Sequence, residues 1–229
     1  MTVLSLVALA ACLLPGENAW AYVGWMLYAA AVLGAVMKSD LARFGWANRV
    51  TLLRGLLLLL TLPQLAPDPR YLWLPPILGA VALALDGVDG RIARRTGEAS
   101  AFGARFDMET DALTVLVLSA LVAAQGRVGA WVLLSGALRY LYVAAGWLWP
   151  RLARPVPPSL ARKLVCVLQI AGLLLALLPI VPPPWPAAVA AVSLGLLVWS
   201  FGRDVVWLLC QKGMAESPIA PYLPQDGGV

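Results

Sequence analysis

Residues 86–111 read DGVDGRIARRTGEASAFGARFDMETD and place four aspartates at fixed spacings. Asp86 and Asp89 are three residues apart and Asp107 and Asp111 are four apart, so each pair lies on one face of a helix. The connection between the pairs lets the second helix fold back beside the first, so that the four carboxylates converge. Like charges held so close are unfavourable unless a cation lies between them. All-oxygen ligands select hard ions, so the spacing predicts a site for Mg²⁺ or Mn²⁺.

Small and basic residues lie between the two aspartate pairs. Gly90 and Ala93 leave room for a flat ligand against the helix backbone, and Arg94 offers a planar fork of donors suited to phosphate. Carboxylates for a metal, an arginine for phosphate and a glycine–alanine notch together indicate a nucleoside-diphosphate site for phosphoryl transfer. The chain has no His and its three Cys are far apart in the sequence, so zinc and haem sites lack ligands.

The complete pattern D-x2-D-G-x2-A-R-x8-G-x3-D-x3-D resembles the signature of the CDP-alcohol phosphotransferases, or CDP-alcohol phosphatidyltransferases, at every position. The resemblance implies that the hydroxyl of an acceptor alcohol attacks the β-phosphorus of a CDP-linked donor and that CMP leaves. It implies two bound divalent ions, with Asp86, Asp89 and Asp107 as ligands. Asp111 would be a ligand, the general base on the acceptor hydroxyl, or both. The residues implied to line the CDP pocket are Gly90, Ala93, Arg94 and Gly103.

A second segment resembles the same family less closely. Asn48-Arg-Val-Thr51-Leu-Leu-Arg54 is similar to the N-x-x-T-x-x-R segment that opens the first core helix of the family. The resemblance makes Asn48 and Thr51 candidates for binding CDP, and Arg54 a candidate for its phosphates. Plain helix capping by Asn48 or Thr51 is the alternative.

Three basic residues are candidates for the phosphate or the acceptor. Arg139 lies well inside an apolar run, in an A-L-R segment that resembles one of bacterial phosphatidylserine synthases, and a charge so placed is expected to be functional. Arg162-Lys163 with Gln169 is loosely similar to the G-K-x-K-T-x-x-Q segment of phosphatidylglycerophosphate synthases. The glycine, second lysine and threonine of that segment are replaced here, which argues against a glycerol-phosphate acceptor.

Composition indicates an integral membrane protein. Of 229 residues, 61% are hydrophobic and 13% are charged, about half the charged share of a soluble domain. The basic residues flank apolar runs and do not cluster with aromatic residues, so the net charge of +5 does not indicate nucleic-acid binding. We expect an all-α, polytopic membrane protein in which a six-helix core follows an N-terminal hydrophobic hairpin and a juxtamembrane interfacial helix.

The expected segments follow from the apolar runs and from the Pro- and Gly-rich breaks between them. The hairpin covers residues 1–37, the amphipathic juxtamembrane segment 38–49, the core 50–212 and the C-terminal tail 213–229. The expected core helices cover about 50–66, 72–90, 104–125, 128–149, 162–182 and 185–209.

The distribution of basic residues predicts the orientation in the membrane. If the N-terminus is cytoplasmic and the chain crosses eight times, four basic loops lie in the cytoplasm. Only Arg70 and Arg127 lie on the opposite side. We therefore expect a multi-pass protein of the bacterial cytoplasmic membrane with its active site facing the cytoplasm. The family resemblance also implies a homodimer.

The resemblance thus implies a metal-dependent enzyme of phospholipid synthesis that uses a CDP-linked donor, with CDP-diacylglycerol as the expected donor and an alcohol as acceptor. One alternative is a CDP-linked small alcohol of the choline or ethanolamine type as donor, with a lipid acceptor. Arg94-Arg-Thr96 and the phenylalanine before Asp107 are closer to that group. Another alternative is an ion-coupled transporter whose aspartates bind the coupling ion, although the glycine–alanine–arginine notch argues against it.

Overall fold

The computed structural model describes residues 45–65, 67–96, 100–154, 156–157 and 159–210. The predicted hairpin (1–37), most of the amphipathic segment and the predicted tail (213–229) lie outside the described residues. Within the described part the chain forms helices and no strand, which confirms the predicted all-α fold.

Six long helices make up the described part. They are α3 (Trp46–Leu59), α4 (Leu74–Thr96), α5 (Ala101–Ala124), α6 (Leu133–Leu148), α7 (Leu160–Leu177) and α8 (Trp185–Cys210). Short 3-10 helices in the connections are η2 (Leu62–Leu65), η3 (Pro69–Tyr71), η4 (Ala130–Val132) and η5 (Pro150–Ala153).

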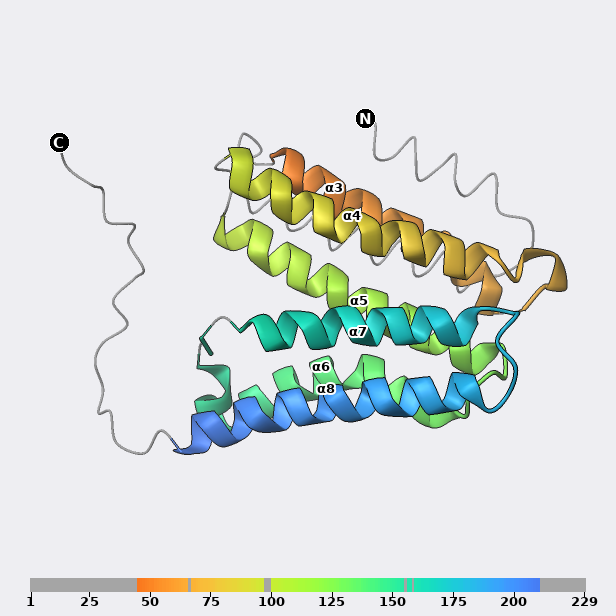
Figure 1. Cartoon of the computed structure of the whole chain (residues 1–229). Coiled ribbons are helices and arrows are strands. Elements are labelled where there is room, and N and C mark those ends of the chain that lie inside the picture. The colour runs from red at the N-terminus through yellow and green to blue at the C-terminus, as the bar shows by residue number, and fades with distance from the viewer. Residues whose placement is uncertain (1–44, 66, 97–99, 155, 158, 211–229) are drawn as a thin grey trace.

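The helices pack as a bundle with α5 at its centre. Figure 1 shows α3 beside α4, α5 near α7, and α6 near α8, all running along roughly the same direction. Helix α5 contacts α3, α4, α6 and α7, and its fully buried Leu118 and Leu121 pack with Leu58, Leu173 and Leu177. The helix that carries Asp107 and Asp111 is therefore held by neighbours on several sides.

Four helical segments of the described part are long and apolar enough to cross a membrane. They are Pro69–Val88, Ala130–Leu148, Leu160–Leu177 and Trp185–Cys210. Large apolar side chains such as Trp147, Leu164 and Trp199 are more than half exposed on them, as expected for surfaces that face lipid. Helix α3 has 14 residues, about 21 Å, which is less than the roughly 30 Å of a bilayer core.

Two helix boundaries near the aspartates differ from the predicted ones. Helix α4 continues to Thr96 instead of ending near residue 90, and α5 begins at Ala101 instead of residue 104. The earlier start of α5 has a local cause, because Ser100 is its N-cap and accepts a hydrogen bond from the backbone N–H of Gly103 at 3.0 Å. The connection between the two helices is therefore shorter than predicted.

Helix α5 ends at Ala124 in a turn that contains Gly126 and positions Arg127 near the end of α7. Gly126 has φ +65°, and its N–H donates to the carbonyl of Ala123 while that of Arg127 donates to Val122. These bonds form a Schellman motif, which favours glycine at this position. The guanidinium of Arg127 then donates to the carbonyls of Ala176, Leu178 and Val181 at 3.1, 2.6 and 2.8 Å. Arg127 thus caps the C-terminus of α7, where a cation is favoured.

We expect Arg127→Met to lower the free energy of unfolding by about 2–3 kcal/mol, because three charge-assisted hydrogen bonds to carbonyls at and just beyond the end of α7 are lost. Thermal unfolding in detergent should show a midpoint lower by about 4–12 °C. Arg70→Met is the matched control, because Arg70 is exposed and pairs with Asp68 in the same turn. Equal midpoints for the two variants would contradict the capping role of Arg127.

Candidate active site

Three polar residues share one buried face of α3. Asn48, Thr51 and Arg54 follow one another at three-residue intervals and are 6%, 3% and 1% exposed. The helix begins at Trp46 with Gly45 as its N-cap, and no side chain caps it. The Thr51 hydroxyl donates to the carbonyl of Ala47 inside the helix. The capping alternative is therefore wrong for Asn48 and Thr51, whose side chains lie within the bundle.

Gly103 makes the close contact between this face of α3 and the start of α5. A Cβ atom on Gly103 would lie 2.9 Å from Asn48 Oδ1, too close for any side chain without a shift of the amide. The glycine of the sequence motif therefore lets Asn48 approach α5. Two residues that sequence analysis assigned to CDP, on different helices, are neighbours in the structure.

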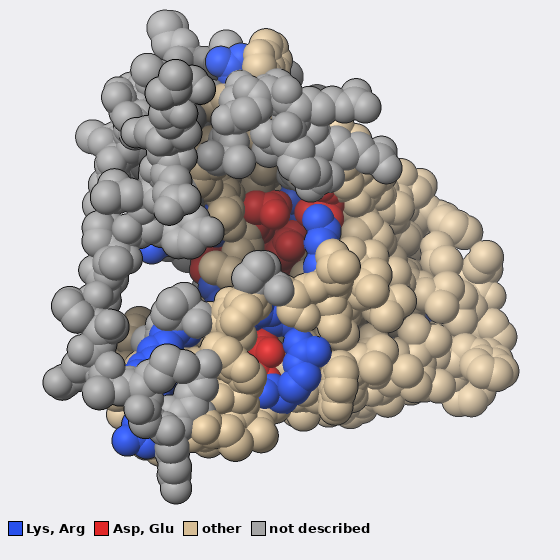
Figure 2. All heavy atoms as spheres, turned by 60° about the vertical axis from the view of Figure 1, so that its left-hand side comes forward, with Lys and Arg blue, Asp and Glu red and all other residues tan. Residues whose placement is uncertain are grey.

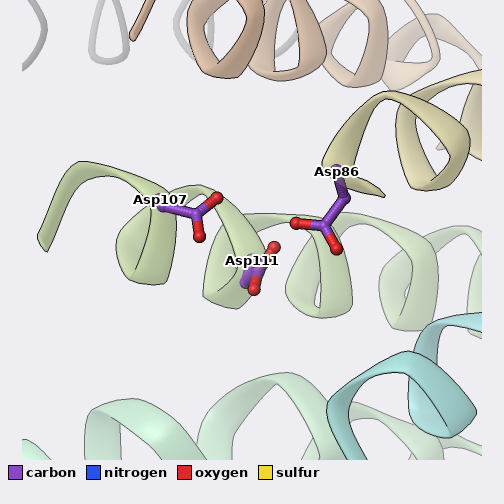
Figure 3. Close-up of side chains that lie close together, drawn as sticks. All are labelled: Asp86, Asp107 and Asp111. Atoms are coloured by element: carbon purple, nitrogen blue, oxygen red, sulfur yellow. The ribbon is translucent and has the colours of Figure 1, made fainter. Parts of the chain in front are cut away.

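Three of the four motif aspartates converge. Asp86 extends from the C-terminal half of α4, and Asp107 and Asp111 extend from successive turns of α5 toward the same space (Figure 3). One carboxylate oxygen of each lies within 4.8 Å of the others, and their side chains are 14%, 41% and 25% exposed. Asp89 lies one turn further along α4, but its side chain is outside the description.

The guanidinium of Arg54 contacts all three carboxylates. Its Nη1 lies 3.1 Å from Asp86 Oδ1 and 2.7 Å from Asp107 Oδ1, and its Nη2 lies 2.6 Å from Asp111 Oδ1. This arrangement differs from the phosphate contact that sequence analysis assigned to Arg54. A single arginine on α3 instead joins the aspartates of α4 and α5.

The three aspartates fit a divalent metal ion. Carboxylate oxygens are the ligands that Mg²⁺ and Mn²⁺ prefer. Oxygens bound to one Mg²⁺ at about 2.1 Å lie no more than about 4.2 Å apart, so a separation within 4.8 Å requires only small side-chain rotations. The guanidinium of Arg54 contacts all three carboxylates, so the space between them favours a positive charge.

A cavity of about 920 Å³ opens beside the aspartates, between α5, α6, α7 and α8. Asp86, Asp107 and Asp111 form one wall, and the rest is a mixture of basic and apolar side chains. Figure 2 looks toward this end of the molecule and shows acidic side chains in a hollow with basic side chains at its border. The described residues assigned to CDP, namely Asn48, Thr51, Gly90 and Gly103, do not line this cavity. The carboxylates therefore lie between a polar face of α3 and a separate cavity.

The basic candidates for the acceptor line the cavity but differ in their partners. Arg139 forms a 2.7 Å ion pair with Glu109, which is 55% exposed. Glu109 thus contacts α6 and is not one of the converging carboxylates. Arg162 is more firmly held, since it pairs with Asp204 at 3.3 Å and donates to the carbonyls of Val156 and Pro157. Lys163 is exposed at the cavity wall.

Asp204 also lines the cavity, although it was not predicted from the sequence. It is 8% exposed in α8, and it pairs with Arg162 and with Arg203, which also donates to Ser159. The available signal was a carboxylate inside a long apolar segment, because such a charge is costly unless it is paired. Arg105 and Arg154 also line the cavity, and neither was singled out.

The motif residues assigned to CDP on α4 lie on the helix that carries Asp86. Gly90 is one turn beyond Asp86, and Ala93 and Arg94 lie in the last turns of α4. The side chains of Ala93 and Arg94 are outside the description, so their roles stay predictions.

Comparison with known families gives a match that covers most of the chain. The sequence profile of the CDP-alcohol phosphatidyltransferase family matches residues 44–200. This range includes Asn48, Arg54, all four motif aspartates and most of α8. Comparisons with curated proteins and with solved structures gave no match. The family is one of divalent-metal-dependent enzymes that transfer a phosphate group from a CDP-alcohol to an acceptor. Its profile covers well over half of the chain, and the chain belongs to the CDP-alcohol phosphatidyltransferase family.

Proposed function

We propose that the protein transfers a substituted phosphate group from CDP-diacylglycerol to an acceptor alcohol and releases CMP. The observation that carries the proposal is the convergence of Asp86, Asp107 and Asp111 at the wall of a large cavity. Phosphoryl transfer depends mainly on positioning and charge neutralisation, and a carboxylate cluster beside a substrate-sized cavity supplies both.

The donor binds on the α3–α4 side of the carboxylates. Asn48 and Thr51 are the polar residues on that side, and Gly103 lets Asn48 pack closely against the start of α5. Gly90, Ala93 and Arg94 continue this side along α4, where Arg94 would contact phosphate. With the donor on this side, the cavity between α5, α6, α7 and α8 is left for the second substrate.

Asp86, Asp89, Asp107 and Asp111 would hold the divalent ions, either Mg²⁺ or Mn²⁺. When bound, such ions neutralise the pyrophosphate and stabilise charge on the attacking and leaving oxygens. The protein's own contribution is to hold the carboxylates of α4 and α5 at one point and to position both substrates there.

Asp111 is the candidate general base. Its Oδ1 is held by Arg54, whereas its Oδ2 lies 3.9 Å from the Cys166 thiol of α7, and the residue lines the cavity. In the proposed reaction the acceptor hydroxyl gives its proton to Asp111 Oδ2 as its oxygen bonds to the β-phosphorus. The bond from that phosphorus to the CMP oxygen breaks, and CMP leaves with the electron pair.

The acceptor enters through the cavity. Arg139 and Lys163 are the basic groups best placed to contact it, because the ion-pair partner of Arg139 is the exposed Glu109 and Lys163 is itself exposed. Arg162 has three protein partners and contributes mainly by holding the loop before α7 against α8. Truncation of Arg139 should therefore affect acceptor binding more directly than truncation of Arg162.

One observation favours the reverse assignment, in which a CDP-linked small alcohol is the donor and a lipid is the acceptor. Much of the cavity wall is apolar, with Val143, Trp147, Leu152, Ile170 and Phe201 among its residues. An apolar wall beside exposed tryptophans suits an acyl chain that enters from the bilayer. The transporter alternative is disfavoured by the family to which the chain belongs.

A product assay separates the two assignments. Purified protein in Mn²⁺ is given CDP-diacylglycerol with water-soluble alcohols, or CDP-choline and CDP-ethanolamine with diacylglycerol. Our proposal predicts CMP and a new phospholipid only in the first arm. Product in the second arm alone would establish the reverse assignment, and product in neither arm would contradict both.

The site is proposed to face the cytoplasm of a bacterial cell. Among described segments, the start of α3, the start of α5, η5 and the C-terminal half of α8 lie at the end of the bundle that holds the aspartates. These segments carry or adjoin Arg49, Arg105, Arg154 and Arg203. The connections α3–α4 and α5–α6 lie at the other end, and they carry Arg70 and Arg127. This asymmetry agrees with the positive-inside rule. The homodimer implied by the family stays a prediction.

Cysteine labelling tests this orientation. In a variant without the native cysteines, Ser100→Cys should be labelled only by reagents that enter the cytoplasm, because Ser100 is exposed in the α4–α5 connection. Pro69→Cys, exposed at the opposite end, should react with impermeant reagents from outside. Labelling of Ser100→Cys from outside in intact cells would reverse the proposed orientation.

A further inference from the structure

Arg54 is the most deeply buried charged residue of the carboxylate cluster. Its side chain is 1% exposed, whereas those of Asp86, Asp107 and Asp111 range from 14% to 41%. A buried charge is stable only when it is well paired. Because Arg54 is buried on α3, its charge needs the three aspartates as ion-pair partners.

The contacts use the planar shape of the guanidinium. Nη1 contacts carboxylates of both α4 and α5, while Nη2 contacts a second carboxylate of α5. A lysine ammonium is a compact point charge and lacks this fixed fork of donors. The geometry thus links α3, α4 and α5 through one side chain and fixes the spacing of the carboxylates.

Charge balance gives this link a second consequence. Three carboxylates and one guanidinium in this group sum to two negative charges. Arg54 lowers their mutual repulsion, and it also occupies carboxylate oxygens that a divalent cation would need. The same residue therefore stabilises the cluster without metal and opposes the binding of metal.

We propose that Arg54 is a positioning residue that holds Asp86, Asp107 and Asp111 together as their permanent counter-charge and competes with divalent cations for them. The competition rests on the proposed metal site, whereas the positioning rests on the ion pairs alone. The role differs from a contact with the donor phosphates, because it operates in the absence of any nucleotide.

Thermal unfolding of the full-length protein in detergent and EDTA tests the positioning role. Arg54→Met should unfold about 5 °C or more below the wild type, because three closely spaced, partly exposed carboxylates lose their common counter-charge. Arg54→Lys should unfold between the two, because it keeps the charge and loses the fork. Arg70→Met, which removes an exposed arginine from the opposite end, should match the wild type.

A second substitution separates charge pairing from packing. If Arg54→Met destabilises through repulsion, adding Asp111→Asn should raise its midpoint toward that of the wild type. If Arg54 only fills space, the double variant should be no more stable than Arg54→Met. If Arg54→Met alone does not fold, the double variant still tests the charge-pairing role. Recovery of folded protein in the double variant would support the proposal, and failure to recover it would contradict the proposal.

Binding of Mn²⁺, followed by the electron paramagnetic resonance signal of the free ion, tests the competition. Arg54→Met, or Arg54→Lys if only that variant folds, should bind Mn²⁺ more tightly than the wild type, by about tenfold or more for Arg54→Met. Equal or weaker affinity would contradict the competition. Absence of Mn²⁺ binding in every variant, wild type included, would contradict the metal site of the proposed function, while the stability rescue would still decide the positioning role.

Discussion

Asp107→Asn is expected to reduce CMP release by about 10³-fold or more. An amide at this position would weaken the binding of the divalent ions, and these ions would neutralise the phosphates of the donor. Asp107 is the most exposed of the three converging carboxylates, so its loss should leave the bundle folded. The same loss is expected for Asp86→Asn and Asp89→Asn. The measurement is the initial rate of CMP formation by folded, purified variants at saturating Mn²⁺.

Asp68→Asn is the matched control for this set. Asp68 pairs with Arg70 at the opposite end of the bundle, and that hydrogen bond holds the pKa of its carboxyl below the usual value. Its amide variant should release CMP at the wild-type rate. If Asp107→Asn, folded and pure, behaves like this control, the assignment of Asp107 to the metal site is wrong.

The second large effect is expected for Asp111→Asn, in turnover more than in donor affinity. Asparagine keeps the size of the side chain and one oxygen ligand but cannot accept the proton of the acceptor hydroxyl. Loss of a general base typically costs 10²–10⁴ in rate, and it should appear in kcat. Binding of the CDP donor and turnover should be measured on the same preparation.

The outcome for Asp111→Asn distinguishes two roles. A large fall in kcat with nearly unchanged donor binding supports the general base. If the variant loses donor binding but turns over normally whatever donor still binds, Asp111 acts as a ligand that organises the site. The base must then be another group of the cavity wall.

The sequence was sufficient to predict the helical fold and the convergence of three of the four aspartates, because helical periodicity places each of them on one face of its helix. Asp86, Asp107 and Asp111 lie at helical spacings, and a short connection between two helices brings them to one end of the bundle. Helix ends were harder to predict, since the start of α5 depends on the cap made by Ser100. Such caps act over a single turn and change a boundary by a few residues.

Contacts between distant segments could not be predicted from the sequence. The ion pairs of Arg54 with the aspartates depend on how α3 packs against α4 and α5. The sequence alone suggested only a phosphate contact for this residue. In the same way, the pairing of Asp204 with Arg162 depends on the packing of α7 against α8. Periodicity places a residue on a face of its helix but does not identify the helix that this face meets.

The most direct test of the account is the formation of CMP by the purified wild-type protein with a CDP-linked lipid, an acceptor alcohol and Mn²⁺. The proposed function predicts that CMP and the new phosphodiester form in equal amounts. It also predicts that omission of the acceptor or addition of EDTA stops both, and that excess Mn²⁺ restores them after EDTA. Absence of CMP across CDP-linked donors and acceptors of both arrangements would contradict the account, as would undiminished CMP formation in EDTA.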